Sequence, residues 1–204
     1  RNKDAFADLS KKFGCSPDAA IDIISYAQQL GIRIKGLSFH VGSQSPNPTK
    51  YVEAINACAK VINKVSELGL PALSTLDIGG GFPVPYSADV LPINVFCAPI
   101  NVALAQLPET MQIIAEPGRF IVASSVTSVA SVMGQAQREG RTWYYLDDGI
   151  YGSFSGLIFD EAAYPIDSAK QDGERFESVL AGPTCDSIDV VSDSIMLPKL
   201  NNGD

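Results

Sequence analysis

Hydrophobic positions in the first half of the chain recur with two different periods. Three segments have apolar residues at the spacing of an amphipathic helix: 17–31, 48–69 and about 94–107. The first two begin with proline and end with glycine, as helices commonly do. Three short apolar runs typical of strands alternate with these segments: 32–41, 73–83 and 111–119. The alternation predicts right-handed βαβ units around a parallel sheet.

The pattern changes after Arg119. Runs of β-branched and aromatic residues separated by turns follow, without helical spacing: 120–137, 142–154 and 175–182. We therefore expect an α/β domain over residues 1–122, followed by β structure over residues 123–204.

Three loop motifs follow the three expected strands: HVGSQ at 40–44, GGGF at 79–82 and EPGR at 116–119. In parallel α/β architectures the loops at the carboxyl ends of the strands form the ligand site. Three chemically different loops at the same edge of one sheet therefore predict a single site to which all of them contribute.

The residue types in these loops suit a ligand with a phosphate and an aromatic ring. Gly79–Gly81 expose backbone N–H groups that can bind a phosphate, although a tight turn alone would also explain them. The guanidinium of Arg119 favours the phosphate. Glu116 would be repelled by that phosphate unless the ligand carries a protonated nitrogen some distance away; the alternative is an ion pair with Arg119. Pyridoxal 5'-phosphate (PLP) meets these conditions, with its ring against His40, which could otherwise be an ordinary packed side chain.

Composition narrows the classes of function. The formal net charge of −8, the isoelectric point near 4.6 and the lack of a basic run argue against nucleic-acid binding. No apolar run reaches the roughly 18 residues that a membrane span needs. Four scattered cysteines without a CxxC pair are typical of a reduced, cytoplasmic protein. With His40 as the one histidine, neither a zinc site nor a Ser-His-Asp triad can be assembled, and we expect no metal.

Five motifs, taken together and in this order, resemble a known family: FHVGSQ, LDIGGGFP, AEPGR, DDGIYGSF and GPTCDSID. They are similar to those of the fold-type III PLP-dependent ornithine and lysine decarboxylases. The resemblance covers nearly the whole chain. It implies part of a (β/α)8 TIM-type barrel, of the alanine-racemase-like kind, followed by the first part of a β-barrel or β-sandwich-like domain. It also implies decarboxylation of L-ornithine or L-lysine to putrescine or cadaverine, in polyamine biosynthesis.

The same resemblance implies roles for individual residues. His40 would stack on the cofactor ring, Glu116 would hold the pyridine nitrogen, and the phosphate would lie against a set of loop residues: Ser43, Gly79, Gly80, Gly81, Gly118 and Arg119. Asp160 and Asp186 would bind the distal ammonium group of the substrate. Cys185 would be the catalytic proton donor after CO2 leaves. Cys185 and Asp186 would act in the active site of a second subunit, so the resemblance implies a homodimer with shared sites.

Several alternatives stay open at this point. On its own, Cys185 could be a small buried side chain and Asp160 a solvated turn carboxylate. The chain could also come from an inactive decarboxylase-like regulatory protein or from a diaminopimelate decarboxylase, and ornithine and lysine differ by one methylene, too little to separate from sequence. The family's cofactor-binding lysine has no counterpart here, because no lysine of the chain has the required context; Lys11 and Lys12 precede a helix, for example, and Lys60 and Lys64 are on one. We therefore expect these residues to be an internal portion of a longer enzyme.

Overall fold

The computed structural model describes residues 12–86, 89–160 and 162–204. The chain divides into two compact units that meet between Ser125 and Val126, and each is described by itself. The boundary expected from the residue pattern lay between 122 and 123.

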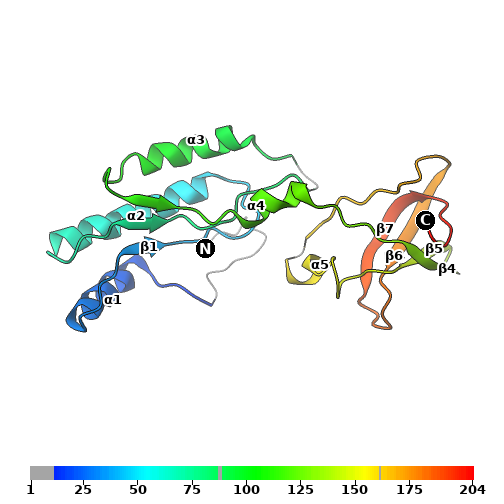
Figure 1. The fold of residues 1–204 in the computed structure, drawn as a ribbon, viewed down its shortest axis with the longest axis horizontal. Helices are drawn as coiled ribbons and strands as arrows, with labels where there is room; N and C mark the ends of the chain where they lie inside the picture. The colour runs from blue at the N-terminus through cyan, green and yellow to red at the C-terminus, as the bar shows by residue number, and fades with distance from the viewer. Residues whose placement is uncertain (1–11, 87–88, 161) are drawn as a thin grey trace. The chain divides into compact units, whose positions relative to one another are not determined.

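The first unit contains a parallel sheet with the strand order β1-β2-β3. The strands are short: β1 (Gly36–Ser38), β2 (Thr75–Asp77) and β3 (Gln112–Ile114). Leu37, Leu76 and Ile113 are in register across the sheet. Three helices alternate with the strands along the chain: α1 (Pro17–Gln29), α2 (Thr49–Glu67) and α3 (Ile93–Leu104) (Figure 1). The predicted alternation around a parallel sheet is confirmed.

The strands are much shorter than the apolar runs that predicted them. The run at 32–41 contributes only Gly36–Ser38 to the ladder, although Ile34 and Phe39 on either side pack against the core. A run of apolar residues indicates that their side chains are buried. A strand also needs backbone hydrogen bonds to a neighbouring strand at each residue. The residues after each strand turn into loops instead, and these loops carry the motifs.

The core of the first unit lies between the helices and the sheet. Helix α1 begins at Ser16, whose hydroxyl accepts a hydrogen bond from the N–H of Ala19 at 3.2 Å. Helix α2 buries one face, including Tyr51 and Ile55, neither of which is exposed. The Tyr51 ring packs against Phe82 and Phe96, with ring centroids 5.1 and 5.8 Å apart. Because Phe82 is the last residue of the GGGF motif, this aromatic cluster attaches that loop to helices α2 and α3.

One expectation for the segment after Arg119 is wrong. The run of β-branched residues that begins at 120 predicts a strand, but it starts with a short helix, α4 (Gly118–Val122), and a 3₁₀ turn, η2 (Ala123–Ser125). The Phe120 ring packs against Phe82 at 6.2 Å between centroids, while Ile121 and Val122 are exposed. Packing of a single aromatic side chain therefore outweighs the local β propensity.

The second unit is built on a four-stranded sheet with the order β4-β5-β6-β7. The strands are β4 (Val132–Arg138), β5 (Arg141–Leu146), β6 (Arg175–Ala181) and β7 (Val190–Pro198), and a short helix, α5 (Gly156–Phe159), lies between β5 and β6. The pairs β4–β5 and β6–β7 are antiparallel, whereas β5 and β6 are parallel. The mainly β character expected for this half is confirmed.

The hairpin between β4 and β5 has a two-residue turn. Both Glu139 and Gly140 have positive φ, at 52° and 77°, which matches the twist of the flanking strands. Along β5 the side chains of Thr142, Tyr144 and Leu146 alternate into the core. Every second side chain of the strand therefore lies in the core, as the geometry of a strand requires.

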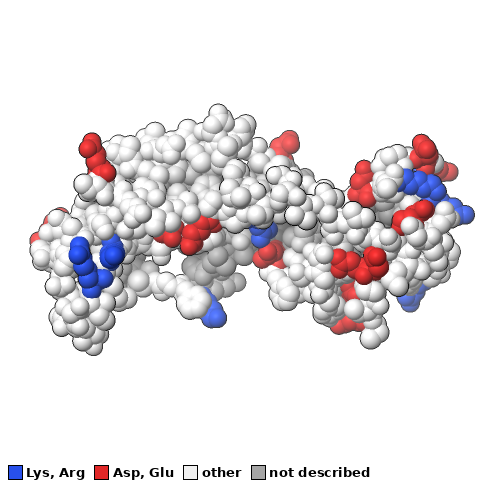
Figure 2. Space-filling model, in the orientation of Figure 1, with Lys and Arg blue, Asp and Glu red and all other residues white. Residues whose placement is uncertain are grey.

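Charged side chains on the face in Figure 2 are scattered over both units. The face in Figure 2 shows acidic residues in several separate places, with few basic residues among them. No helix among the described residues is long and apolar enough to cross a membrane. All four cysteines are free thiols: Cys15, Cys58, Cys97 and Cys185.

Candidate functional site

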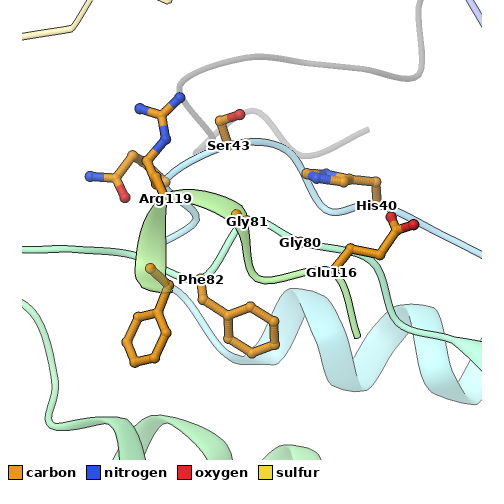
Figure 3. Close-up of a pocket in the computed structure, with 10 residues that line it drawn as sticks. His40, Ser43, Gly80, Gly81, Phe82, Glu116 and Arg119 are labelled. Carbon is orange, nitrogen blue, oxygen red and sulfur yellow. The ribbon is translucent and has the colours of Figure 1, made fainter. Parts of the chain in front are cut away.

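A cavity of about 220 Å³ opens where the three parallel strands of the first unit end. Seven of the eight residues proposed for cofactor binding line it: His40, Ser43, Gly80, Gly81, Glu116, Gly118 and Arg119 (Figure 3). Three further lining residues were not predicted as site residues: Gln44, Phe82 and Phe120. The three loop motifs therefore meet in one place, as the position of each loop after its strand requires.

The glycine turn has no room for side chains. A Cβ atom on Gly79 would lie 2.2 Å from the carbonyl oxygen of Phe39, and one on Gly81 would lie 2.2 Å from that of Gly42. Both glycines also have positive φ, 65° and 97°. Gly79 does not line the cavity; its N–H donates to Asp77 and its carbonyl accepts from the N–H of Glu116. Gly79 thus supports the turn rather than forming the wall.

The glycine turn also leaves hydrogen-bond donors available. Among the described residues, no hydrogen bond uses the N–H of Gly80 or of Gly81. Unpaired backbone N–H groups in a glycine-rich turn are suited to an anion such as a phosphate. The turn therefore has the tight geometry of the first interpretation and also the available donors that the second one needs.

Side chains from neighbouring loops hold this turn in place. The buried Tyr51 hydroxyl donates to the carbonyl of Gly80 at 2.8 Å, and burial raises the pKa of that phenol well above its ordinary value. The Gln44 side chain bonds both backbone groups of Val84, donating to the carbonyl at 3.0 Å and accepting from the N–H at 2.9 Å. The HVGSQ and GGGF loops are therefore joined to each other and to helix α2.

His40 presents a neutral ring to the cavity. Its Nδ1 accepts a hydrogen bond from the N–H of Gly42 at 2.9 Å, so in the neutral ring the proton is on Nε2. Although part of the side chain reaches solvent, burial lowers the pKa of His40 from its ordinary value of 6.5, against the opposing effects of Glu116 and Asp77. An uncharged imidazole is suited to stacking on an aromatic ring.

The two ends of the cavity differ in chemistry. In Figure 3, Arg119 and Ser43 lie toward one end, His40 and Glu116 lie toward the other, and Gly80 and Gly81 are between them. Glu116 forms no ion pair with Arg119 within the described part of the chain, so that alternative does not hold. A guanidinium, a hydroxyl and free N–H groups suit a phosphate; an imidazole and a carboxylate suit a protonated pyridine ring. The residues present fit PLP.

The environment of His40 leads to a testable prediction. The His40 ring should titrate with a midpoint below 6.5, and Glu116→Gln should lower the midpoint further, because the removed negative charge favours the protonated ring. NMR of the imidazole signals in the cofactor-free protein would measure both, with His40→Gln used for assignment. Since the unfolded chain would bind the proton more readily, the free energy of unfolding should fall as the pH drops below 6.5.

The exposed Glu109 offers a matched control for this titration. Glu109→Gln removes a carboxylate of the same kind that does not line the cavity, and it should leave the His40 midpoint unchanged. A midpoint at or above 6.5 in the parent protein, or an upward shift in Glu116→Gln, would contradict the assignment.

The remaining predicted residues belong to the second unit. Cys185 is exposed in this chain, so it is not the buried apolar thiol of the alternative interpretation. Asp186, also exposed, accepts a hydrogen bond from the Tyr151 hydroxyl, and this bond lowers the pKa of the carboxyl group and raises that of the phenol. Asp160 ends helix α5. A catalytic or substrate-binding role for these residues stays a prediction.

The predictions from sequence missed residues of three kinds. Gln44 and Phe82 lie within the motifs FHVGSQ and GGGFP, so the motifs themselves contained the signal. Tyr151 and Asp189 lie in DGIYGSF and GPTCDSID, but nothing in either motif indicates that the two loops bond each other. Phe120 had no signal, because its segment was read as a strand.

Comparisons with known proteins agree with this arrangement. The sequence model of the family described as "Pyridoxal-dependent decarboxylase, pyridoxal binding domain" matches residues 3–123. A lysine/ornithine decarboxylase of Selenomonas ruminantium is 39% identical over 208 residues, which is 100% of this chain and 52% of that protein. Antizyme inhibitor 2 of Xenopus laevis is 36% identical over 97% of this chain and 47% of its own length.

Solved structures of related proteins are also similar to this chain over nearly its whole length. A crystal structure of lysine/ornithine decarboxylase from Vibrio vulnificus, complexed with cadaverine, is 68% identical with a TM-score of 0.94, over 96% of this chain and 54% of that one. The chain thus spans about half the length of the relatives it matches. The resemblance inferred from the five motifs is confirmed, and the chain belongs to the pyridoxal-dependent decarboxylase family.

Proposed function

We propose that the complete protein is a PLP-dependent carboxy-lyase that converts a basic amino acid, L-ornithine or L-lysine, to the diamine putrescine or cadaverine. The observation that carries the proposal is the cavity of the first unit, with an anion-binding end and an imidazole–carboxylate end. The names of the relatives support the substrate class, since lysine/ornithine decarboxylases are among them. The proposal includes both ornithine and lysine as substrates, because they differ by only one methylene group.

Six residues of the cavity have roles in this proposal. Arg119, Ser43 and the N–H groups of Gly80 and Gly81 hold the phosphate, and Glu116 holds the pyridine nitrogen in its protonated form. His40 packs its neutral ring on the cofactor ring. When bound, PLP supplies a ring that accepts the electrons left at the α-carbon as CO2 departs.

The second unit supplies the substrate contacts and the proton. The carboxylates of Asp160 and Asp186 bind the distal ammonium group of the substrate. The Cys185 thiol delivers a proton to the carbon that has lost CO2. Cys185 and Asp186 act in the site of a second subunit of a homodimer; their exposure on this chain is what such a shared site needs.

The first unit is part of a (β/α)8 barrel in this proposal, and the second is part of a β domain, with the division near 122/123. The exposed side chains of β3 support the barrel: Ile113 and Ile114 are each 39% exposed, and further strands along this edge would cover them. The high TM-score against a protein about twice as long is in keeping with the same arrangement.

The full-length protein provides the test. It should bind PLP, develop a visible absorption band that borohydride treatment removes, and release CO2 from ornithine or lysine. Comparing kcat/KM for the two amino acids, with diaminopimelate as a third substrate, assigns the specificity. A protein that binds no PLP, or that releases CO2 from neither ornithine nor lysine, would overturn the proposal.

A regulatory binding protein is the second candidate, because one relative is named as an antizyme inhibitor. Such a protein would keep the fold without decarboxylating any of the three amino acids. The presence of His40, Glu116 and Arg119 together at one cavity favours the enzyme, since a fold kept only for binding has no need of them.

A further inference from the structure

Asp189 is a buried carboxylate at the end of the loop that carries Cys185. Its side chain is only 2% exposed. Oδ1 accepts a hydrogen bond from the N–H of Ile150 at 2.9 Å, while Oδ2 accepts from the N–H of Thr184 at 3.1 Å and from the Thr184 hydroxyl at 2.7 Å. One side chain therefore joins two loops that are more than 30 residues apart in sequence.

This carboxylate has no cationic partner in the described part of the chain, where no lysine or arginine forms an ion pair with it. Burial by itself would raise the pKa of Asp189, but the hydrogen bonds from Thr184 and Ile150 outweigh it and lower the pKa. The group is thus ionised at neutral pH, and backbone N–H groups and a hydroxyl take the place of water around it. A buried charge held in this way needs every one of those donors.

The space around Asp189 is closed by glycines. A Cβ atom on Gly149 would lie 2.2 Å from Asp189 Oδ1, and one on Gly182 would lie 2.1 Å from the same oxygen. Neither glycine has a positive φ, so it is the approach of the carboxylate that excludes a side chain at both positions. The Asp189 carboxylate can therefore lie here only because both neighbouring positions are glycine.

One of the two loops that Asp189 joins carries two residues of the proposed chemistry, and the other carries a hydrogen-bond partner of one of them. Thr184 directly precedes Cys185 and Asp186, and Ile150 directly precedes Tyr151, whose hydroxyl bonds Asp186. The Asp189 N–H also donates to the carbonyl of Asp186 at 3.0 Å. A shift of the Asp189 side chain would break the hydrogen bonds that join the two loops, and would change the position of one loop relative to the other.

We propose that Asp189 is a positioning residue, which holds the loop 182–189 against the loop 149–154 and thereby sets the Cys185 thiol and the Asp186 carboxylate. This inference rests on the proposed function for what the two side chains do, but the link between the loops is a property of the second unit alone.

Asp189→Asn in the full-length protein tests the inference. An asparagine lacks one acceptor oxygen and turns an NH2 group toward an N–H or hydroxyl donor. Hydrogen exchange of the Ile150 and Thr184 amides in the cofactor-free protein should become roughly tenfold faster. In the holoenzyme, KM for the amino acid should rise and the ratio of diamine formed to CO2 released should fall. Affinity for PLP should stay unchanged, because the cavity belongs to the first unit.

Matched variants separate positioning from general stability. Asp193→Asn changes an exposed carboxylate on β7, and should leave exchange, KM and the product ratio as in the parent protein. Thr184→Ser keeps the hydroxyl donor and should behave like the parent. Thr184→Val removes that donor together with the acceptor of the longer bond from the Asp186 N–H at 3.4 Å, and should shift exchange and product ratio in the direction of Asp189→Asn, to a smaller extent.

Two results would overturn the inference: a folded Asp189→Asn protein with parental exchange and product ratio, or, should that variant fail to fold, a Thr184→Val protein with both unchanged. The exchange measurement does not depend on catalysis. A parent protein that releases no CO2 would therefore overturn the proposed function, while exchange alone would still decide the loop link.

Discussion

Gly81→Ala is expected to weaken PLP binding by about 100-fold or more, equivalent to roughly 2.7 kcal/mol. The new Cβ atom would lie 2.2 Å from the carbonyl oxygen of Gly42, and the backbone at Gly81 has a φ of 97° that alanine tolerates poorly. Either the turn or the HVGSQ loop must move, and both line the cavity. Titration of the full-length apoprotein with PLP, followed by absorbance, measures the affinity.

Gly134 serves as the control, because the space around it could hold a side chain. A Cβ atom on Gly134, in β4, would meet nothing within 4 Å, so Gly134→Ala should leave PLP affinity unchanged. Circular dichroism would show whether Gly81→Ala keeps its secondary structure. A folded Gly81→Ala protein with parental PLP affinity would show that the turn does not form the phosphate site.

Cys185→Ala is expected to lower kcat for diamine formation by about 100-fold, the typical contribution of a positioned general acid. The reason is the loss of the proton donor, so CO2 release should exceed diamine formation. Turnover in D2O adds a second readout: the parent enzyme should place deuterium on one face of the carbon that lost CO2, and the variant on both. PLP affinity should not change.

Cys15 is the matched control, because it is the other exposed thiol. Cys15→Ala should keep the parental rate, product ratio and deuterium placement. A Cys185→Ala protein that loses PLP binding to the same degree as activity would contradict the assigned role, since it would place the thiol in cofactor binding.

Mixing two inactive variants tests the shared site. Arg119→Ala would lack the phosphate contact in the first unit, and Cys185→Ala would lack the proton donor in the second. If each site combines the first unit of one subunit with the second unit of its partner, heterodimers regain one intact site, and the mixture should recover roughly a quarter of parental activity. No recovery in a mixture that has exchanged subunits would exclude sharing.

Much of the first unit could be predicted because its signals are local. Ser16 and Pro17 start helix α1, and Gly31 follows its end, since helix termini are governed by nearby caps and backbone preferences. The meeting of the three loop motifs also followed from order alone, because parallel strands place their carboxyl ends at one edge. The residue types in those loops suggested the phosphate and ring contacts, and the family motifs added the roles of Cys185, Asp160 and Asp186; the experiments above test these roles.

The errors and omissions came from long-range packing. Residues 118–125 have the composition of a strand, yet Phe120 packs on Phe82 and the segment is helical. Strand limits were too wide because hydrogen-bonded partners far along the chain set them. The bond between Asp189 and Ile150 spans 39 residues, and no local pattern predicts it.

Local spacing and the motifs were sufficient to predict the alternation of helices and strands, the change to β structure in the second half, and the family, because none of these requires knowledge of contacts between distant residues. The tertiary structure alone decided which donors remain free at the glycine turn, how His40 is kept neutral, and which carboxylate is buried beneath the Cys185 loop. Those properties depend on burial and on distances between residues remote in sequence. They arise only once the chain has brought the residues together.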